Sequence, residues 1–369
     1  MQIHILGTSS SKPAHGRSVS GSVVNTEKGG IIVDCGEGFQ ERIFTHNKEL
    51  KEKGSQFRIK VSKISTILLT HGHLDHTWGL LPLLKTLSLE GRDKPITIIA
   101  PTTHEIINRL LEKNDPFCDI SDLEPSNVDL CFQFRHWWSL GGTKEFLEFD
   151  TNWILIGVDE NDKIGTINGI LIDPLEKSIE KITDFKKYTN EIKILNIPTV
   201  HSVPSCAWWI KEDDKKGKFN SELAEKNNLN LEQIQLLAKG ENFEEHSHLD
   251  YRSTEQIGPS VLISGDTSGK NNGFVNFSKT DNCTTLLIHE ATFLEEHIDR
   301  AKKYFHSTAI QAAKNAKLIN ANHLILTHYS SRIKDTLDLK LEAQKEFNSV
   351  HAASDNDIVN LSPTDMEIH

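Results

Sequence analysis

The chain has 369 residues, of which 37% are hydrophobic and 25% charged, and its formal net charge is −11. These values are ordinary for a folded protein of one large domain or two, and the negative charge excludes a general electrostatic affinity for nucleic acid, so an RNA partner must meet a local basic patch. The five cysteines are widely spread without a CxxC pair, which predicts reduced thiols. The chain has neither a signal-peptide pattern at its start nor a bilayer-spanning apolar run, so we expect a cytoplasmic protein without membrane contact.

The N-terminal part predicts three short strands followed by a helix. The strands fall at residues 2–6, 20–24 and 30–33, and the helix at 39–53. Between the third strand and the helix lies Asp34-Cys35-Gly36-Glu37-Gly38. The two carboxylates of this turn either point at a metal centre or cap the helix, and from this motif alone capping is the preferred interpretation.

The most distinctive motif is Thr70-His71-Gly72-His73-Leu74-Asp75-His76. A predicted buried strand at 64–69 precedes it and an apolar helical pattern at 78–89 follows, which places the motif in a strand-to-helix loop. Three imidazoles and a carboxylate within six residues are the donors that a borderline metal such as Zn²⁺ prefers. We therefore interpret the motif as part of a metal site.

The middle of the chain predicts layered sheet and helix. A strand at 95–100 and a helix at 103–113 continue the alternation of strands and helices. Residues 115–187 are less regular, with strands predicted near 153–158 and 169–172. Three tryptophans lie in this region, and we interpret them as core residues in preference to a base-stacking platform: Trp137, Trp138 and Trp153.

A long polar segment separates two later strands. The strand at 192–200 ends at His201, and a further strand follows at 206–210. Residues 211–259 are then strongly polar, with predicted helices at 221–226 and 231–239. Such an excursion is typical of a surface insertion. Because it leaves directly from the strand after His201, it is also a candidate substrate arm.

Polar groups follow each apolar strand of the C-terminal third. Strands at 261–263, 286–288 and 323–326 run into Asp266, His289-Glu290 and His328, and His306 begins an alanine-rich helix at 306–319. One such strand end means little. Several of them together indicate that the ends converge on one site.

These scattered donors complete the metal site. His71 and His73 can face one ion while Asp75 and His76 face a second, and Asp266 can bridge the two. The predicted metal ligands are His71, His73, Asp75, His76, His201, Asp266 and His328. The donor set predicts two Zn²⁺ ions, with Mn²⁺ or Fe²⁺ as alternatives, and room for a shared water. Such a pair lowers the pKa of that water and holds a phosphoryl group for in-line attack, which predicts a hydrolase.

The HxHxDH cluster with its distant partners resembles the metallo-β-lactamase superfamily, and further motifs resemble the ribonuclease Z family within it. The resemblance implies an α/β (α+β) fold, a four-layer αββα sandwich. It implies one metallo-hydrolase domain over residues 1–369 with an inserted arm at 211–259, and removal of the 3′ trailer from precursor tRNA. The motifs run in family order: Leu6-Gly7-Thr8-Ser9, 34–40, Gly265-Asp266-Thr267, His289-Glu290-Ala291-Thr292-Phe293, 306–309 and 326–332.

The resemblance also implies roles for three residues. Asp75 would orient or deprotonate the nucleophile, and His306, positioned by Glu290, would protonate the departing 3′ oxygen. Without the family match, a helix N-terminal histidine and a buried cap are the preferred interpretations of His306 and Glu290. With it, the turn at 34–38 becomes support for the metal loop. The resemblance further implies a homodimer in which the arm of one subunit serves the active site of the other.

The chain departs from the family pattern in ways that leave the substrate open. The family usually has HLHGDH, whereas here Gly72 and Leu74 are exchanged; Trp208 and Trp209 replace a usual glycine and tyrosine, the arm lacks an evident glycine-proline motif, and the 115–187 region is enlarged. The alternative is a dinuclear hydrolase for a small phosphodiester, a cyclic nucleotide or a sulfate ester. A non-enzymatic RNA-binding paralogue is disfavoured because all seven ligands are present.

Overall fold

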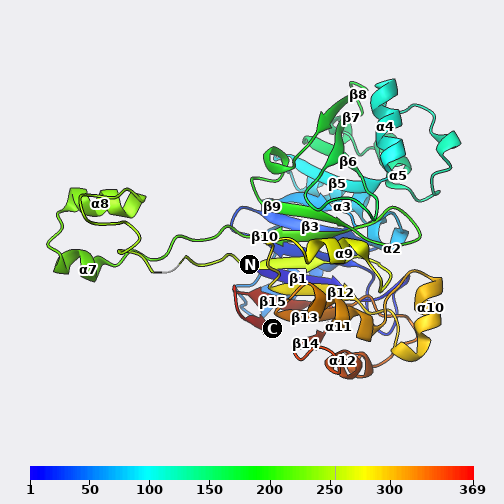
Figure 1. The fold of residues 1–369 in the computed structure, drawn as a ribbon. Coiled ribbons are helices and arrows are strands. Elements are labelled where there is room, and N and C mark those ends of the chain that lie inside the picture. The colour runs from blue at the N-terminus through cyan, green and yellow to red at the C-terminus, as the bar shows by residue number, and fades with distance from the viewer. Residues whose placement is uncertain (254) are drawn as a thin grey trace.

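The computed structural model describes residues 1–253 and 255–369. Within these residues ten strands form one sheet and six form a second, and the two sheets stack face to face with helices outside both (Figure 1). This arrangement confirms the predicted four-layer αββα sandwich.

The larger sheet is antiparallel at both ends and parallel in its middle, from β3 to β6. Strands β15 and β1 pair directly, so the C-terminal segment completes the sheet begun by the first strand. Its order is β16 (Met366–Ile368), β15 (Asp357–Leu361), β1 (Gln2–Gly7), β2 (Gly21–Asn25), β3 (Gly30–Cys35), β4 (Ile64–Leu68), β5 (Ile96–Thr102), β6 (Thr151–Gly157), β7 (Asn168–Asp173) and β8 (Ser178–Ile182).

The smaller sheet is parallel from β11 to β14, and β10 runs antiparallel to both of its neighbours. The carboxyl ends of the parallel strands therefore meet at one edge. The order is β14 (Val350–Ala352), β13 (His323–Thr327), β12 (Leu286–Glu290), β11 (Ser260–Ile263), β10 (Cys206–Lys211) and β9 (Lys193–Pro198).

Helices pack on the outer face of each sheet through separate hydrophobic cores. The larger sheet is covered by α1 (Phe39–Glu52), α3 (Leu80–Leu89), α4 (His104–Lys113) and α5 (Leu130–Ser139). The smaller sheet is covered by α9 (Asn272–Phe277), α11 (Ala309–Leu318) and α12 (Leu337–Gln344). The remaining helices are α2 (Leu74–Thr77), α6 (Lys144–Leu147), α7 (Ser221–Lys226), α8 (Leu231–Lys239) and α10 (Ile298–Lys303).

A third core fills the space between the sheets, which explains why the strands read as continuous apolar runs. Trp208 lies in this core, where its Nε1 donates to Leu69 O at 2.9 Å. Trp209, on the opposite face of β10, packs instead in the core between the smaller sheet and its covering helices. The three tryptophans of the 115–187 region are also buried, as the sequence analysis predicts: Trp137, Trp138 and Trp153.

The structure contains elements that were not predicted, among them β8, β14, β15, β16, α9, α10 and α12, and three further differences concern helices. Helix α5 was not predicted, although its buried apolar residues recur at helical spacing along one side, at Leu130, Cys131, Phe134, Trp137 and Trp138. The predicted helix at 78–89 is α3 and begins at Leu80, while the motif before it, predicted as a loop, contains the short helix α2. The predicted helix at 306–319 begins only at Ala309, with Thr308 as its N-cap.

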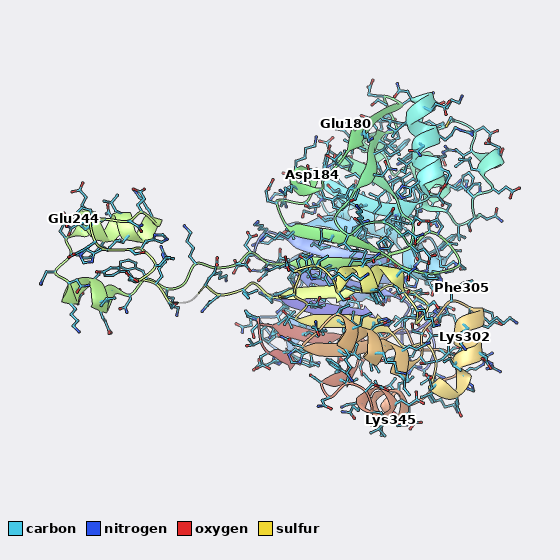
Figure 2. The ribbon with its side chains drawn as sticks, viewed as in Figure 1. Glu180, Asp184, Glu244, Lys302, Phe305 and Lys345 are labelled. Carbon is cyan, nitrogen blue, oxygen red and sulfur yellow. The ribbon has the colours of Figure 1, made fainter. Side chains whose placement is uncertain are left out.

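The polar segment between β10 and β11 forms a protruding arm, whose far end carries Glu244 (Figures 1 and 2). Helices α7 and α8 pack there around a small core of their own. The arm leaves the sheet where Lys211 pairs with Ser260. A strand the length of β10 spans about 20 Å. The arm thus leaves from the strand after His201, as the sequence indicates, and β10 first carries the chain to the opposite edge of the sheet.

Among the residues that the structure describes, no helix combines the length and apolar character needed to cross a membrane. All five cysteines are free, in agreement with the expected reduced thiols: Cys35, Cys118, Cys131, Cys206 and Cys283.

A buried histidine pair between β1 and α1 predicts acid sensitivity of the fold. His4 Nδ1 lies 2.9 Å from His46 Nε2. Burial, reinforced by His46, lowers the pKa of His4 to about 3. Below pH 6.5 the unfolded chain therefore binds a proton at His4 that the folded chain does not bind. The free energy of unfolding consequently falls by roughly 2 kcal/mol between pH 6.5 and pH 5, whereas above pH 6.5 the contribution of neutral His4 is fully present.

Urea unfolding of the wild type and of His4→Asn at pH 5 and pH 7.5 checks this prediction. The variant should show a weaker pH dependence, since the difference between the two proteins isolates this residue. Parallel pH dependences in the two proteins would contradict it.

Candidate metal centre

The structure brings all seven predicted metal ligands together at the edge where the parallel strands end. Four of them lie in the loop after β4 and in helix α2, and three follow strands of the smaller sheet. His201 follows β9, Asp266 follows β11 and His328 follows β13. Both sheets thus contribute to one site, because their strands end at the same edge of the sandwich.

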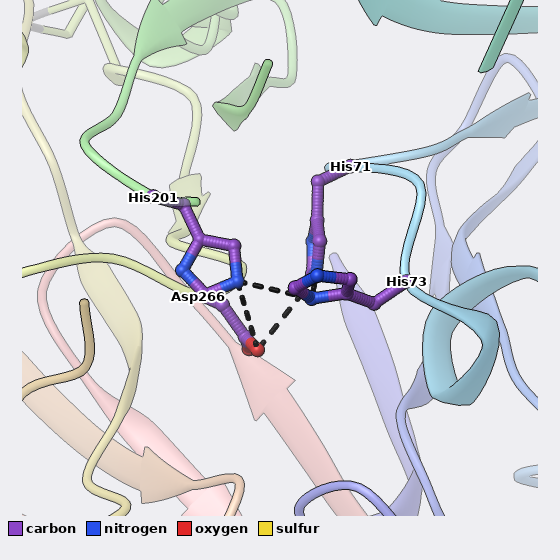
Figure 3. Close-up of side chains that lie close together, drawn as sticks. All are labelled: His71, His73, His201 and Asp266. Carbon is purple, nitrogen blue, oxygen red and sulfur yellow. Dashed lines mark hydrogen bonds and ion pairs between the residues drawn. The ribbon is translucent and has the colours of Figure 1, made fainter. Parts of the chain in front are cut away.

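The first group of donors consists of His71, His73, His201 and Asp266 (Figure 3). His73 Nδ1 lies 3.1 Å from both His71 Nε2 and His201 Nε2. Asp266 Oδ2 lies 3.7 Å from His71 Nε2 and 3.9 Å from His201 Nε2. A tetrahedral zinc site with bonds of 2.0–2.1 Å separates its donors by about 3.3 Å. The group therefore fits a tetrahedral ion.

The second group consists of Asp75, His76 and His328, and Asp266 reaches it as well. The Nε2 atoms of His76 and His328 are 3.2 Å apart, and Asp266 Oδ1 lies 3.3 and 3.2 Å from them. Asp75 Oδ2 is 3.7 Å from His76 Nε2 and 3.5 Å from His328 Nε2. The two oxygens of Asp266 thus face different groups, as expected for a bridging ligand.

Asp266 Oδ1 is buried and has no hydrogen-bond partner among the described residues. A buried carboxylate oxygen without a partner is destabilising, because the desolvation of a buried ion costs on the order of several kcal/mol. A divalent cation between the two groups would remove this cost. The buried oxygen without a partner therefore supports the presence of a bound metal ion.

Four of the imidazoles are held through the ring nitrogen that points away from the donor groups. Such contacts fix the tautomer and the ring orientation of a metal-binding histidine. The contacts join Nδ1 of His71 to Thr70 Oγ1 at 3.0 Å, of His76 to Asp34 Oδ2 at 2.7 Å, of His201 to Phe305 O at 3.0 Å and of His328 to Thr292 Oγ1 at 3.1 Å.

Asp34 supports the metal loop and does not cap helix α1. Its carboxylate accepts hydrogen bonds from the Thr70 backbone N–H and hydroxyl, both at 2.8 Å, in addition to the His76 imidazole. The N-cap of α1 is Gly38, which has no side-chain cap. The capping interpretation from the sequence is therefore wrong, and the alternative, support for the metal centre, describes what this carboxylate does.

Four residues at the site adopt the left-handed conformation without being glycine. The values of φ are 62° at Ser11, 59° at Asp34, 56° at Phe305 and 59° at His328. The conformation lets the Ser11 N–H donate to Asp75 Oδ2 at 2.7 Å and turns the Phe305 carbonyl toward His201. Such conformations are costly and persist where the surroundings hold them, commonly at functional sites.

Two of the ligand imidazoles are neutral and one ligand carboxylate is ionised. Burial lowers the pKa of His71 well below its ordinary value and that of His201 to about 4, so both imidazoles are neutral and free to bind metal. Burial alone would raise the pKa of Asp75, but His76 and His328 hold it well below its usual range. Asp75 is therefore an ionised carboxylate.

His306 and Glu290 form an ion pair beside the metal ligands. His306 Nδ1 lies 2.9 Å from Glu290 Oε1 and 3.9 Å from Asp266 Oδ2. Burial alone would lower the pKa of His306, but Glu290 raises it to about 9, so the imidazole carries a proton at neutral pH. His306 also lies within reach of Asp266 and His328 as a third group of metal donors. The contact of Nδ1 with Glu290 leaves Nε2 available, either to bind a metal ion or to carry a proton.

Glu290 is held in place from several sides. Its oxygens accept from the Thr267 N–H at 3.0 Å, the Thr292 N–H at 3.2 Å and the Thr292 hydroxyl at 2.6 Å. The sequence analysis did not identify Thr292 as a functional residue, although it lies within the family motif at 289–293. Ser11 and Phe305 were also missed, since they act through backbone atoms that leave no signature in the side-chain pattern.

Comparison with known proteins gives relatives over nearly the whole chain. Residues 16–93 match the family model of the metallo-beta-lactamase superfamily. Ribonuclease Z of Prochlorococcus marinus (strain MIT 9301) is 30% identical over 372 residues, and Ribonuclease BN of Proteus mirabilis (strain HI4320) is 29% identical over 367 residues. Both alignments cover 96% of this chain and 98% of the relative.

Solved structures share the fold. The short form of human tRNase Z aligns with a TM-score of 0.55 and 24% identity, covering 98% of this chain and 99% of that one. A long form of RNase Z from yeast aligns with a TM-score of 0.62 and 21% identity, covering 97% of this chain and 41% of the yeast chain. Proteins of this fold family use divalent metal ions, in agreement with the donor groups described above.

Proposed function

Since the chain belongs to the ribonuclease Z family, we propose that it is a metal-dependent endoribonuclease that removes the 3′ trailer from precursor tRNA in the cytoplasm. The observation that carries this proposal is the His306–Glu290 pair, which holds a proton donor beside the metal ligands. Hydrolysis of an RNA diester expels an alkoxide of high pKa, and such a leaving group needs a proton in the transition state.

We assign two Zn²⁺ ions to the two donor groups. His71, His73, His201 and Asp266 would hold one ion, and Asp75, His76 and His328, together with Asp266, would hold the other. The predominance of imidazole favours zinc, with Mn²⁺ or Fe²⁺ as alternatives. The bound ions would supply an activated water and neutralise charge on the phosphodiester.

Asp75 and His306 carry the proton transfers in this proposal. Their side chains are each 13% exposed, whereas those of His76, Asp266 and His328 are at most 3% exposed. Asp75, fixed by the Ser11 N–H, would orient the attacking water and accept its proton. His306, held by Glu290, would protonate the departing 3′ oxygen. A substrate can therefore reach both groups with proton-transfer roles.

The arm at 211–259 is the proposed tRNA-binding exosite of a single metallo-hydrolase domain. It leaves the sheet at the edge opposite the metal ligands and points away from the body (Figure 1). A short RNA held by the arm would therefore not reach the site of the same subunit. A homodimer in which each arm serves its partner's site resolves this geometry.

Removal of the arm tests the exosite. Residues 213–258 can be replaced by a short turn, because Lys211 and Ser260 are paired neighbours in the sheet. We expect kcat/KM for a precursor tRNA to fall by roughly a hundredfold, equivalent to about 2.7 kcal/mol of lost contacts. Hydrolysis of bis(p-nitrophenyl) phosphate, which is too small to touch the arm, should be unchanged.

The same two substrates separate the proposal from the alternative. A precursor tRNA added to the intact protein should inhibit hydrolysis of bis(p-nitrophenyl) phosphate competitively. The alternative of a small phosphodiester, cyclic nucleotide or sulfate ester substrate would be favoured if the tRNA did not compete. It would also require that the intact and shortened proteins act equally on the precursor tRNA.

A further inference from the structure

The loop that carries the first metal ligands packs against a distant segment of the chain. Gly72 lies between His71 and His73, and a Cβ atom built on it would be 1.8 Å from Val128 O and 3.0 Å from the Val128 carbonyl carbon. Any other residue at position 72 would thus push the two segments apart. Glycine is therefore the residue that this contact requires at position 72.

Gln133 of helix α5 connects the two sides of this contact. Its Nε2 donates to Gly72 O at 2.5 Å and to Val128 O at 2.8 Å, and its Oε1 accepts from the Thr77 hydroxyl at 2.8 Å. The residue is only 8% exposed. It contacts the metal-binding motif on both sides, since Gly72 follows the first ligand and Thr77 follows His76.

Helix α5 is a rigid support for this side chain. Asp129 caps the helix by accepting from the Cys131 N–H at 2.8 Å, and it also accepts from the Thr102 hydroxyl at 2.9 Å. Leu130 and Phe134 lie in the core beneath the larger sheet. Gln133 is therefore fixed relative to the sheet from which the metal loop emerges.

We propose that Gln133 is a positioning residue for the divalent-metal site. Through its contacts with Gly72 and Thr77, Gln133 holds His71, His73 and His76 in binding geometry. The inference rests on the proposed metal centre. Loss of the amide would leave the Gly72 carbonyl unsatisfied beside the loop and free the ligands to move apart. Groups that orient metal ligands in this way are worth about tenfold to a hundredfold in metal affinity.

Gln133→Met tests the inference, because it keeps the length of the side chain and removes its hydrogen bonds. The matched control is Arg135→Met on the same helix, whose guanidinium donates at 2.9 Å to the carbonyls of Pro116 and Cys118 and does not touch the metal loop. We expect chelator competition to show a Zn²⁺ dissociation constant raised by about tenfold to a hundredfold in Gln133→Met only.

Two further measurements keep the test independent of activity and of folding. The absorption spectrum of the Co²⁺-loaded protein should change in Gln133→Met and not in Arg135→Met, while both metal-free variants still unfold in a single cooperative thermal transition. Gly72→Ala, which forces the loop away from Val128, should reproduce both the lower affinity and the altered spectrum.

The outcomes are distinguishable from a failure of the proposed function. A wild type that binds zinc, with Gln133→Met and Gly72→Ala binding it equally tightly and giving the same Co²⁺ spectrum, would overturn the positioning role alone. A wild type that binds no divalent metal would overturn the metal centre and the positioning role together.

Discussion

Replacing Asp266 by asparagine is expected to abolish binding of both metal ions and to lower the rate of phosphodiester hydrolysis by roughly ten-thousandfold, about 5.5 kcal/mol in the activation barrier. The reason is that the two oxygens of Asp266 face the two donor groups separately. An amide offers one neutral oxygen in their place and an N–H donor that repels cations. One substitution therefore damages both proposed sites.

Metal content per chain, measured by elemental analysis beside the hydrolysis rate, checks this prediction. Asp281→Asn is the matched control, since Asp281 is exposed and lies close to the start of β12, at the other edge of the sheet. Two ions per chain and an undiminished rate in Asp266→Asn would contradict the bridging role.

Replacing His306 by alanine is expected to affect two substrates very differently. Cleavage of a precursor tRNA should slow by about a hundredfold to ten-thousandfold, the usual contribution of a general acid, because the departing 3′ oxygen then leaves without its proton. Hydrolysis of bis(p-nitrophenyl) phosphate should fall by less than about tenfold, because nitrophenolate is a good leaving group that needs little protonation. Metal content should stay the same.

Two other variants complete this experiment. Glu290→Gln should give a smaller loss with the same preference for the tRNA substrate, since it removes the charge that keeps His306 protonated. His297→Ala is the control, because that histidine is exposed and lies nine positions earlier, outside the site. Equal losses on both substrates, or loss of metal in His306→Ala, would identify His306 as a ligand and not an acid.

The metal ligands could be predicted because their placement follows from the fold. His201, Asp266 and His328 each come directly after an apolar strand, and strand ends of a layered sheet meet at one edge. The HxHxDH spacing supplied the remaining donors. The convergence of these groups therefore needed only the order of strands and polar residues along the chain.

Other features had no local signal in the sequence. Gln133 and Gly72 are 61 positions apart, and only the packing of α5 brings them together. The turn that contains Asp34 has the composition of a helix cap as well as of a metal support, and the choice depends on a contact with His76 across 42 positions. The direction of the arm depends on the direction in which β10 runs in the sheet, antiparallel to both neighbours, which apolar spacing does not reveal.

The most direct test of the account is cleavage of a precursor tRNA that carries a defined 3′ trailer, with the zinc-loaded protein, with Asp266→Asn and with the wild type in excess chelator. The account predicts a single cut at the end of the mature tRNA, leaving a 3′ hydroxyl on the tRNA and a 5′ phosphate on the trailer, in the zinc-loaded wild type alone. An intact precursor in the presence of zinc-loaded protein that still hydrolyses bis(p-nitrophenyl) phosphate would contradict it.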